Sequence, residues 1–73
     1  MLKPAQIATD EKELLVSWYR YGPNALVRDR AHAVLMNNQG LNARRIANLL
    51  FRDYKTVRTW LSSFKKHRIS SLF

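Results

Sequence analysis

The chain has 73 residues, which suffices for one small domain and is too short for a second hydrophobic core. Thirteen Lys and Arg residues against five Asp and Glu give a net charge of +8, which favours a polyanionic partner, nucleic acid before an anionic membrane surface. The 47% of hydrophobic residues indicates a globular protein, and no apolar run approaches the roughly 18 to 20 residues that span a bilayer.

The residue types present offer little for catalysis or metal binding. Cysteine is absent, which excludes disulfides and thiolate zinc sites. His32 and His67 are far apart in the sequence, and we interpret them as a solvent-facing residue and part of a cationic tail. The five acids fall at helix starts, at a cap or within a basic helix, so they do not form a paired catalytic set. We expect no enzymatic activity, no metal and no cofactor.

The N-terminal part predicts a lead-in followed by one helix. Residues 1–9 lack periodicity and contain Pro4, so we expect a flexible segment. A helix is predicted over residues 11–21, with Thr9 and Asp10 as caps, and Gly22 in the left-handed conformation ends it. Its apolar stripe has residues at helical spacing: Leu14, Leu15, Trp18 and Tyr21.

A second helix is predicted over residues 24–38, with Gly40 just beyond its end. Four of its residues are expected to face the core: Val27, Ala31, Val34 and Leu35. This helix would support the two shorter helices that follow, because two short helices alone bury too little apolar surface to hold their angle.

The stretch from Gly40 to Leu61 predicts a helix-turn-helix. Its first helix covers residues 43–50 with Asn42 as N-cap, and its second covers residues 54–67 with Asp53 as N-cap. The apolar side of this pair contains residues at helical spacing: Ile46, Ala47, Leu50, Val57, Trp60, Leu61 and Phe64. The fold class is therefore all-α, a small bundle of about four helices, and residues 10–73 form a single domain.

Several motifs of this chain resemble the N-terminal DNA-binding domain of bacterial insertion-sequence transposases of the mariner-like superfamily, which has a homeodomain-like fold. The resemblance rests on an Arg-Asp-Arg-Ala run at residues 28–31, Gly-Leu-Asn at 40–42, Ile-Ala at 46–47 and Thr-Val-Arg-Thr-Trp-Leu at 56–61. It implies a module that binds transposon ends in the bacterial cytoplasm, at the nucleoid. The family's catalytic domain would belong to a longer chain.

The turn departs from the family's pattern. The family usually has Gly followed by an apolar residue there, whereas this chain has Phe51 and Arg52. Phe suits a positive φ poorly, so we expect a remodelled turn. Arg68 also replaces a Gly that is common near the end of the family's domain.

Double-stranded DNA is the partner we expect, with the helix over residues 54–67 in the major groove. We expect five of its residues to read the DNA: Lys55 and Arg58 at guanine O6 and N7, and Tyr54, Thr56 and Thr59 at base methyl groups or flanking phosphates. Seven residues are expected to bind phosphates: Asn42, Arg44, Arg45, Arg52, Lys65, Lys66 and Arg68.

Three other interpretations stay open. A small stand-alone transcriptional regulator would share the DNA-binding face and could dimerise through the apolar residues Ile69, Leu72 and Phe73. A basic helical protein-interaction module would bind another protein instead of DNA. A domain lying on anionic membranes would need apolar residues that a core this small requires for itself, so we expect no membrane partner.

Overall fold

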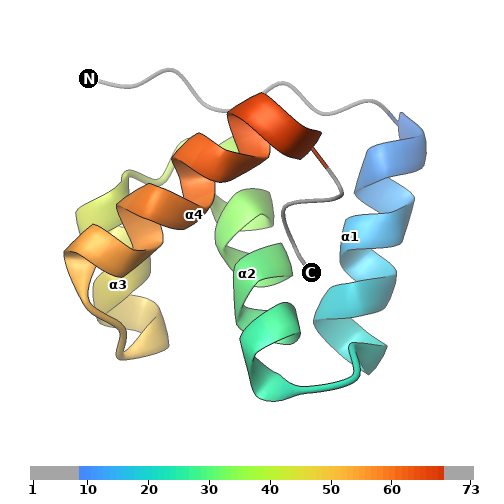
Figure 1. Cartoon of the computed structure of the whole chain (residues 1–73), viewed down its shortest axis with the longest axis horizontal. Helices are drawn as coiled ribbons and strands as arrows, with labels where there is room; N and C mark the ends of the chain where they lie inside the picture. Colours follow the sequence, from blue (N-terminus) through green and yellow to red (C-terminus); the bar gives the residue numbers. More distant parts are fainter. Residues whose placement is uncertain (1–8, 69–73) are drawn as a thin grey trace.

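The computed structural model describes residues 9–68, and in this range the chain forms four α-helices and no β-strand. They are α1 (Thr9–Tyr21), α2 (Ala25–Asn38), α3 (Ala43–Leu50) and α4 (Tyr54–His67). The predicted all-α bundle of four helices is confirmed. Figure 1 shows α1 beside α2, α3 on the opposite side of α2, and α4 running across the top of the bundle. The expectations for residues 1–8 and for Ile69, Leu72 and Phe73 lie outside the described residues.

The central element is α2, which packs against each of the other three helices. Val27, Ala31 and Val34 are buried as predicted, and Leu35 is half-buried against the core. Because α2 has neighbours on several sides, it buries more than one stripe. Three further residues of α2 are also buried: Ala33, Met36 and Asn37.

The stripe predicted for the first helix is only partly correct. Leu15 is fully buried and Trp18 is half-buried against the core, whereas Leu14 is 45% and Tyr21 79% exposed. The main neighbour of α1 is α2, so a narrower stripe suffices. The helix also begins at Thr9, which places the two expected caps, Thr9 and Asp10, inside its first turn.

The turn between α1 and α2 needs glycine for space. Gly22 does not have the positive φ that we expected of it. A Cβ atom at Gly22 would lie 2.5 Å from the carbonyl oxygen of Trp18, closer than atoms of these types approach. The amide of Gly22 donates to that same oxygen at 2.9 Å, and Arg28 Nη1 donates to the Gly22 carbonyl at 2.9 Å. The carbonyl oxygen of Trp18, in the last turn of α1, therefore leaves no room for a side chain at this position.

Three helices begin one residue after an N-cap. Asn24 Oδ1 accepts from Val27 N at 2.9 Å, Asn42 Oδ1 from Arg45 N at 2.9 Å, and Asp53 Oδ2 from Lys55 N at 3.0 Å. Each side chain thus satisfies an amide that has no partner within its helix. The caps predicted at Asn42 and Asp53 are confirmed.

At the end of α2 the chain turns sharply toward α3. Gly40 has a φ of 105°, Leu41 N donates to Met36 O at 3.2 Å, and Gly40 N donates to Asn37 O at 3.0 Å. This pair of bonds is the Schellman motif, which satisfies the last carbonyls of a helix. The buried Asn37 side chain supports the turn, because its Nδ2 donates to Leu41 O at 3.0 Å.

The two helices of the helix-turn-helix meet over a shared core. Ile46 and Ala47 of α3 are 0% and 4% exposed, and Leu50 is half-buried against them. The α4 residues of this core are those predicted, and all are buried: Val57, Trp60, Leu61 and Phe64. The small side chain of Ala47 allows the two helices to approach closely.

Candidate nucleic-acid interface

In the turn between α3 and α4, Phe51 has a backbone conformation that glycine usually adopts. Phe51 has φ 54° and ψ 42°, the left-handed conformation, and its side chain is 96% exposed. Arg52 N donates to Ala47 O at 3.0 Å and Phe51 N to Asn48 O at 3.4 Å, which is again the Schellman arrangement. The expected remodelling of the turn is therefore wrong. The backbone has the left-handed conformation that glycine favours, and Phe51 adopts it despite the steric strain on its Cβ atom.

Arg52 is turned toward the support helix. Its Nη2 lies 2.8 Å from Asp29 Oδ2 of α2, and its guanidinium carbon lies 5.6 Å from the centre of the Trp60 ring. Arg30 also lies over that ring, at 5.8 Å. The sequence predicted a phosphate contact for Arg52, but an ion pair with Asp29 competes with that role.

Helical spacing divides the exposed side of α4 into two ridges. The groove ridge faces α3 and contains Tyr54, Arg58 and Lys65, which line one groove together with the buried Leu61. The outer ridge lies further round the helix, and each of its residues is exposed: Lys55, Thr59, Ser62 and Lys66. The sequence predicted a base contact for Arg58, and the structure places this residue in the wall of the groove.

The outer ridge presents mixed chemistry. Thr59 Oγ1 donates to Lys55 O at 2.9 Å, so the hydroxyl proton is used within the helix. The methyl group and the oxygen lone pairs of Thr59 stay available to an external partner. Ser62 lies between Thr59 and Lys66 on this ridge, and it was not among the residues predicted from the sequence to contact DNA. Thr56 is exposed as well.

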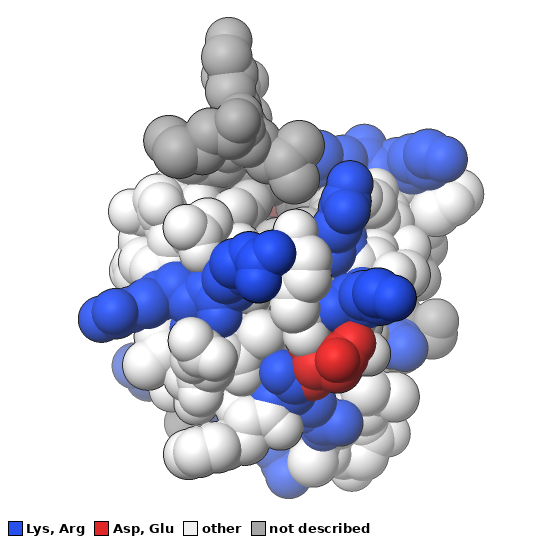
Figure 2. Space-filling model, turned by 90° about the vertical axis from the view of Figure 1, so that its left-hand side faces the viewer, with Lys and Arg blue, Asp and Glu red and all other residues white. Residues whose placement is uncertain are grey.

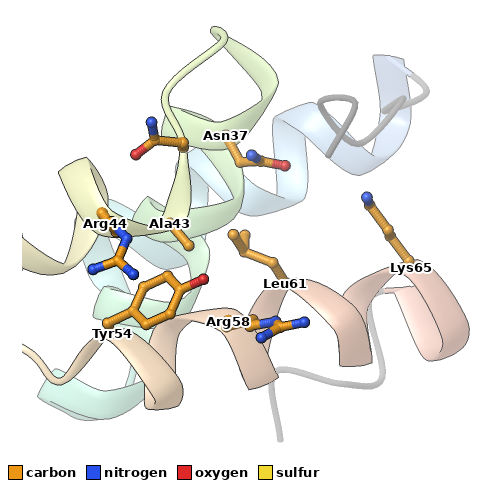
Figure 3. A pocket seen from close by; sticks show the side chains of 8 residues that line it. Asn37, Ala43, Arg44, Tyr54, Arg58, Leu61 and Lys65 are labelled. Atoms are coloured by element: carbon orange, nitrogen blue, oxygen red, sulfur yellow. The ribbon is translucent and has the colours of Figure 1, made fainter. Parts of the chain in front are cut away.

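A groove of about 350 Å³ separates the start of α3 from α4 (Figure 3). The guanidinium carbon of Arg44 lies 4.5 Å from the centre of the Tyr54 ring, so these two side chains are stacked at the groove. Tyr54 is half-buried and packs against the hydrophobic core. Among the described residues that line the groove, three are cationic and none is acidic: Arg44, Arg58 and Lys65 are the cations.

The polar side of α3 faces solvent. Arg44, Arg45 and Asn48 are exposed, as is the cap residue Asn42. The first turn of α3 contains no acid and two arginines. A cation is disfavoured at a helix N-terminus, where the backbone dipole is positive, and an anion is favoured there. The start of α3 therefore suits an external anion.

Comparison with protein families matched residues 24–73, more than half of the chain, to the homeodomain-like domain. The chain belongs to the homeodomain-like family. The match covers α2, α3 and α4, and α1 lies outside the matched residues and packs on α2. Comparisons with curated proteins and with solved structures gave no significant match.

Cations cover much of the face on which α3 and the start of α4 of this homeodomain-like domain lie. Figure 2 shows this face, with Lys and Arg side chains spread over it and acidic atoms gathered mainly in one small area. The acids of the described residues have structural positions or lie on α1: Asp29 pairs with Arg52 and Asp53 caps α4. The family suggests DNA binding, and this charge distribution is consistent with it.

Three cations lie at the end of α4. Lys65 and Lys66 are exposed, and Arg68 pairs with Glu11 of α1, its Nη2 lying 2.6 Å from Glu11 Oε1. This hydrogen bond raises the pKa of Arg68 above its usual value. The guanidinium also lies 4.8 Å from the centre of the Phe64 ring. Arg68 therefore ties the end of α4 to α1, which competes with the phosphate contact predicted for it.

His32 differs from the solvent-facing residue that we expected. It is half-buried, and its ring centre lies 4.3 Å from that of Tyr19 on α1. Burial lowers the pKa of His32, and the nearby Asp29 opposes that change. Within residues 9–68, no three His, Cys, Asp or Glu side chains come together as metal ligands would, and no helix in this range is long and apolar enough to cross a membrane.

Proposed function

We propose that this homeodomain-like domain binds double-stranded DNA sequence-specifically, with α4 in the major groove. The observation that carries the proposal is the division of α4 into two faces. Its apolar residues, including Val57 and Phe64, are fully buried, while its outer ridge is exposed, basic and polar. An α-helix fits the major groove, where each base pair presents a distinct pattern of donors, acceptors and methyl groups.

In such a complex some side chains would contact bases and others would contact phosphates. Lys55 and Arg58 suit guanine O6 and N7, while Thr56 and Thr59 offer methyl groups and oxygens to base edges. Arg58 lines the groove and is exposed, so it would reach a base from the groove wall. The exposed cations elsewhere would bind the sugar-phosphate backbone and set the position of α4: Arg44, Arg45, Lys65 and Lys66.

We further propose that the DNA targets are the ends of a mobile element, with the domain acting as the DNA-binding module of a transposase in the bacterial cytoplasm. Support comes from the motifs at residues 28–31, 40–42 and 56–61 that resemble transposase N-terminal domains. A catalytic domain would be supplied by a longer chain.

Selection of bound DNA tests both levels of the proposal. Duplexes with a random central segment would be enriched by binding to the purified protein. Sheared genomic DNA from the organism that encodes the protein would be enriched in the same way. We expect one sequence motif, located in inverted repeats at the ends of multicopy elements. Enrichment of single-copy palindromes upstream of genes would instead identify a regulator. A pool that stays random would contradict sequence-specific binding, and binding to anionic vesicles in its place would identify a membrane-surface domain.

A further inference from the structure

We propose that the groove between the start of α3 and α4 binds one phosphate of the DNA backbone through Arg44, and that Tyr54 is a positioning residue whose ring holds Arg44 in place. The inference rests on the proposed DNA binding and adds the identity of one contact. It also moves Tyr54 from the residues expected to reach a base to those that prepare a cation.

The packing of Tyr54 argues against base contact. Its ring is half-buried, packs against the hydrophobic core and has the Arg44 guanidinium 4.5 Å from its centre. The guanidinium over the ring and the core against the residue leave little of Tyr54 on which a base could stack. Figure 3 shows Tyr54 and Arg44 together at one end of the groove, with Arg58 further along α4.

Stacking leaves Arg44 able to bind an anion. A guanidinium meets an aromatic ring with its flat face, while its five N–H donors point outward in its plane. Phosphate accepts hydrogen bonds from these in-plane donors. Because the ring already restricts the long side chain, less conformational freedom is lost when phosphate binds.

The surroundings of Arg44 favour an anion at this position. Arg44 and Arg45 occupy the first turn of α3, where the helix dipole disfavours cations, and no acid of that turn compensates them. Arg58 and Lys65 add positive charge to the same groove, whose described lining contains no acid. Its volume of about 350 Å³ is many times the roughly 10–15 Å³ that one water molecule needs by the same measure, so a phosphate group can enter.

A scan of single neutral linkages in the DNA tests the phosphate contact. Each phosphate of a selected duplex would be replaced in turn by a methylphosphonate, and affinity would be measured for the wild type, Arg44→Ala and Arg45→Ala. Because several cations are proposed to bind phosphates, we expect more than one sensitive linkage. At the linkage bound by Arg44 the replacement should weaken the wild type about tenfold, the loss typical of a charge-assisted hydrogen bond. The affinity of Arg44→Ala should be unaffected by the replacement of that linkage, and only of that linkage. The affinity of Arg45→Ala should still fall when that linkage is replaced. Identical profiles for wild type and Arg44→Ala would overturn the contact.

Two substitutions test the role of Tyr54. Tyr54→Phe keeps the ring and should bind as the wild type does, whereas Tyr54→Leu should weaken specific and scrambled duplexes alike. Combining Tyr54→Leu with Arg44→Ala should cause no further loss beyond Arg44→Ala, because Tyr54 acts through Arg44. If Tyr54→Phe loses affinity only on the selected duplex, Tyr54 reads a base through its hydroxyl and the inference is wrong.

Folding and DNA binding are controlled separately. Thermal melting of each variant shows whether it is folded, and the Tyr54→Phe result together with the methylphosphonate scan decides the inference even if Tyr54→Leu unfolds. A wild type that binds no duplex would contradict the proposed function itself. A wild type that binds DNA, with Arg44→Ala unchanged in affinity and salt dependence, would contradict this inference alone.

Discussion

Arg52 and Asp29 link the helix-turn-helix to its support helix across 23 positions of sequence. Arg52 Nε and Nη2 donate to the same carboxylate oxygen, Asp29 Oδ2, at 3.0 and 2.8 Å. The Arg52 guanidinium lies over Trp60 as well, so one side chain from the turn touches both α2 and α4. The pair therefore helps to set the angle between α4 and α2.

The first prediction separates this structural role from phosphate binding. Arg52→Ala should lower the free energy of unfolding by about 1 kcal/mol, the upper end for partly exposed ion pairs. That loss would lower the melting temperature by about 4–8 °C in a domain of this size. The dependence of DNA affinity on salt should stay as in the wild type. A salt slope reduced by about one, with an unchanged melting temperature, would instead make Arg52 a phosphate contact.

A second prediction concerns the crossing of α3 and α4 at Ala47. Ala47 is 4% exposed, and its carbonyl accepts the Arg52 amide at 3.0 Å, so a larger side chain would separate the helices and disturb the turn. Ala47→Leu should cost about 1–3 kcal/mol in stability, against at most about 0.5 kcal/mol for the exposed Arg45→Ala control. Equal melting temperatures for the two variants would show that the helices do not cross closely at Ala47.

The strain at Phe51 gives a third prediction. A left-handed backbone costs a non-glycine residue about 1–2 kcal/mol, while glycine adds about 0.5–1 kcal/mol of chain entropy to the unfolded state. Because the ring is 96% exposed, little burial is lost on its removal. Phe51→Gly should therefore raise stability by up to about 1 kcal/mol, whereas Phe51→Ala, which keeps the strain, should leave it nearly unchanged. Denaturant unfolding of both variants measures this difference, and a clear loss of stability in Phe51→Gly would contradict it.

His32 predicts a dependence of stability on pH. Burial lowers its pKa from the usual 6.5, so the unfolded chain binds the proton more readily than the folded one. Its contribution to stability is full above the unfolded pKa and is lost as the pH falls through that value toward the folded pKa. The nearby Asp29 opposes this lowering of the pKa, and Lys12 and Arg20 line the same groove as His32.

Melting temperatures between about pH 7.5 and 5.5 test this dependence. We expect the wild type to lose more stability on acidification than His32→Gln does. The control is His67→Gln, which should lose as much as the wild type if His32 is responsible. The interpretation fails if His32→Gln and the wild type have parallel profiles.

The bounds of α3 and α4 could be predicted because their signals are local. Asn42 and Asp53 stand one residue before each helix, and the apolar residues that follow repeat at helical spacing. The buried residues of α1 could not be predicted from the sequence, because the spacing of apolar residues does not show how many helices pack against α1. Leu14 and Tyr21 fit the period but face solvent, since α1 packs mainly on α2 alone.

The roles of individual arginines depend on partners distant in sequence. Arg52, Arg68 and Arg44 are all cations near the helix-turn-helix, but the first two pair with acids 23 and 57 positions away. Arg44 instead stacks on Tyr54. Charge alone does not specify which cation will be paired, so the sequence predicted the same phosphate-binding role for all three.

The most direct test of the central claim compares Arg58→Ala with Arg45→Ala on a selected duplex and a scrambled one at several salt concentrations. If α4 reads bases, Arg58→Ala should lose about 1–3 kcal/mol of binding on the selected duplex and little on the scrambled one. Arg45→Ala should weaken both duplexes equally and lower the salt slope by about one. Equal losses on both duplexes for Arg58→Ala, with the wild type itself showing no preference between them, would contradict sequence-specific reading by α4.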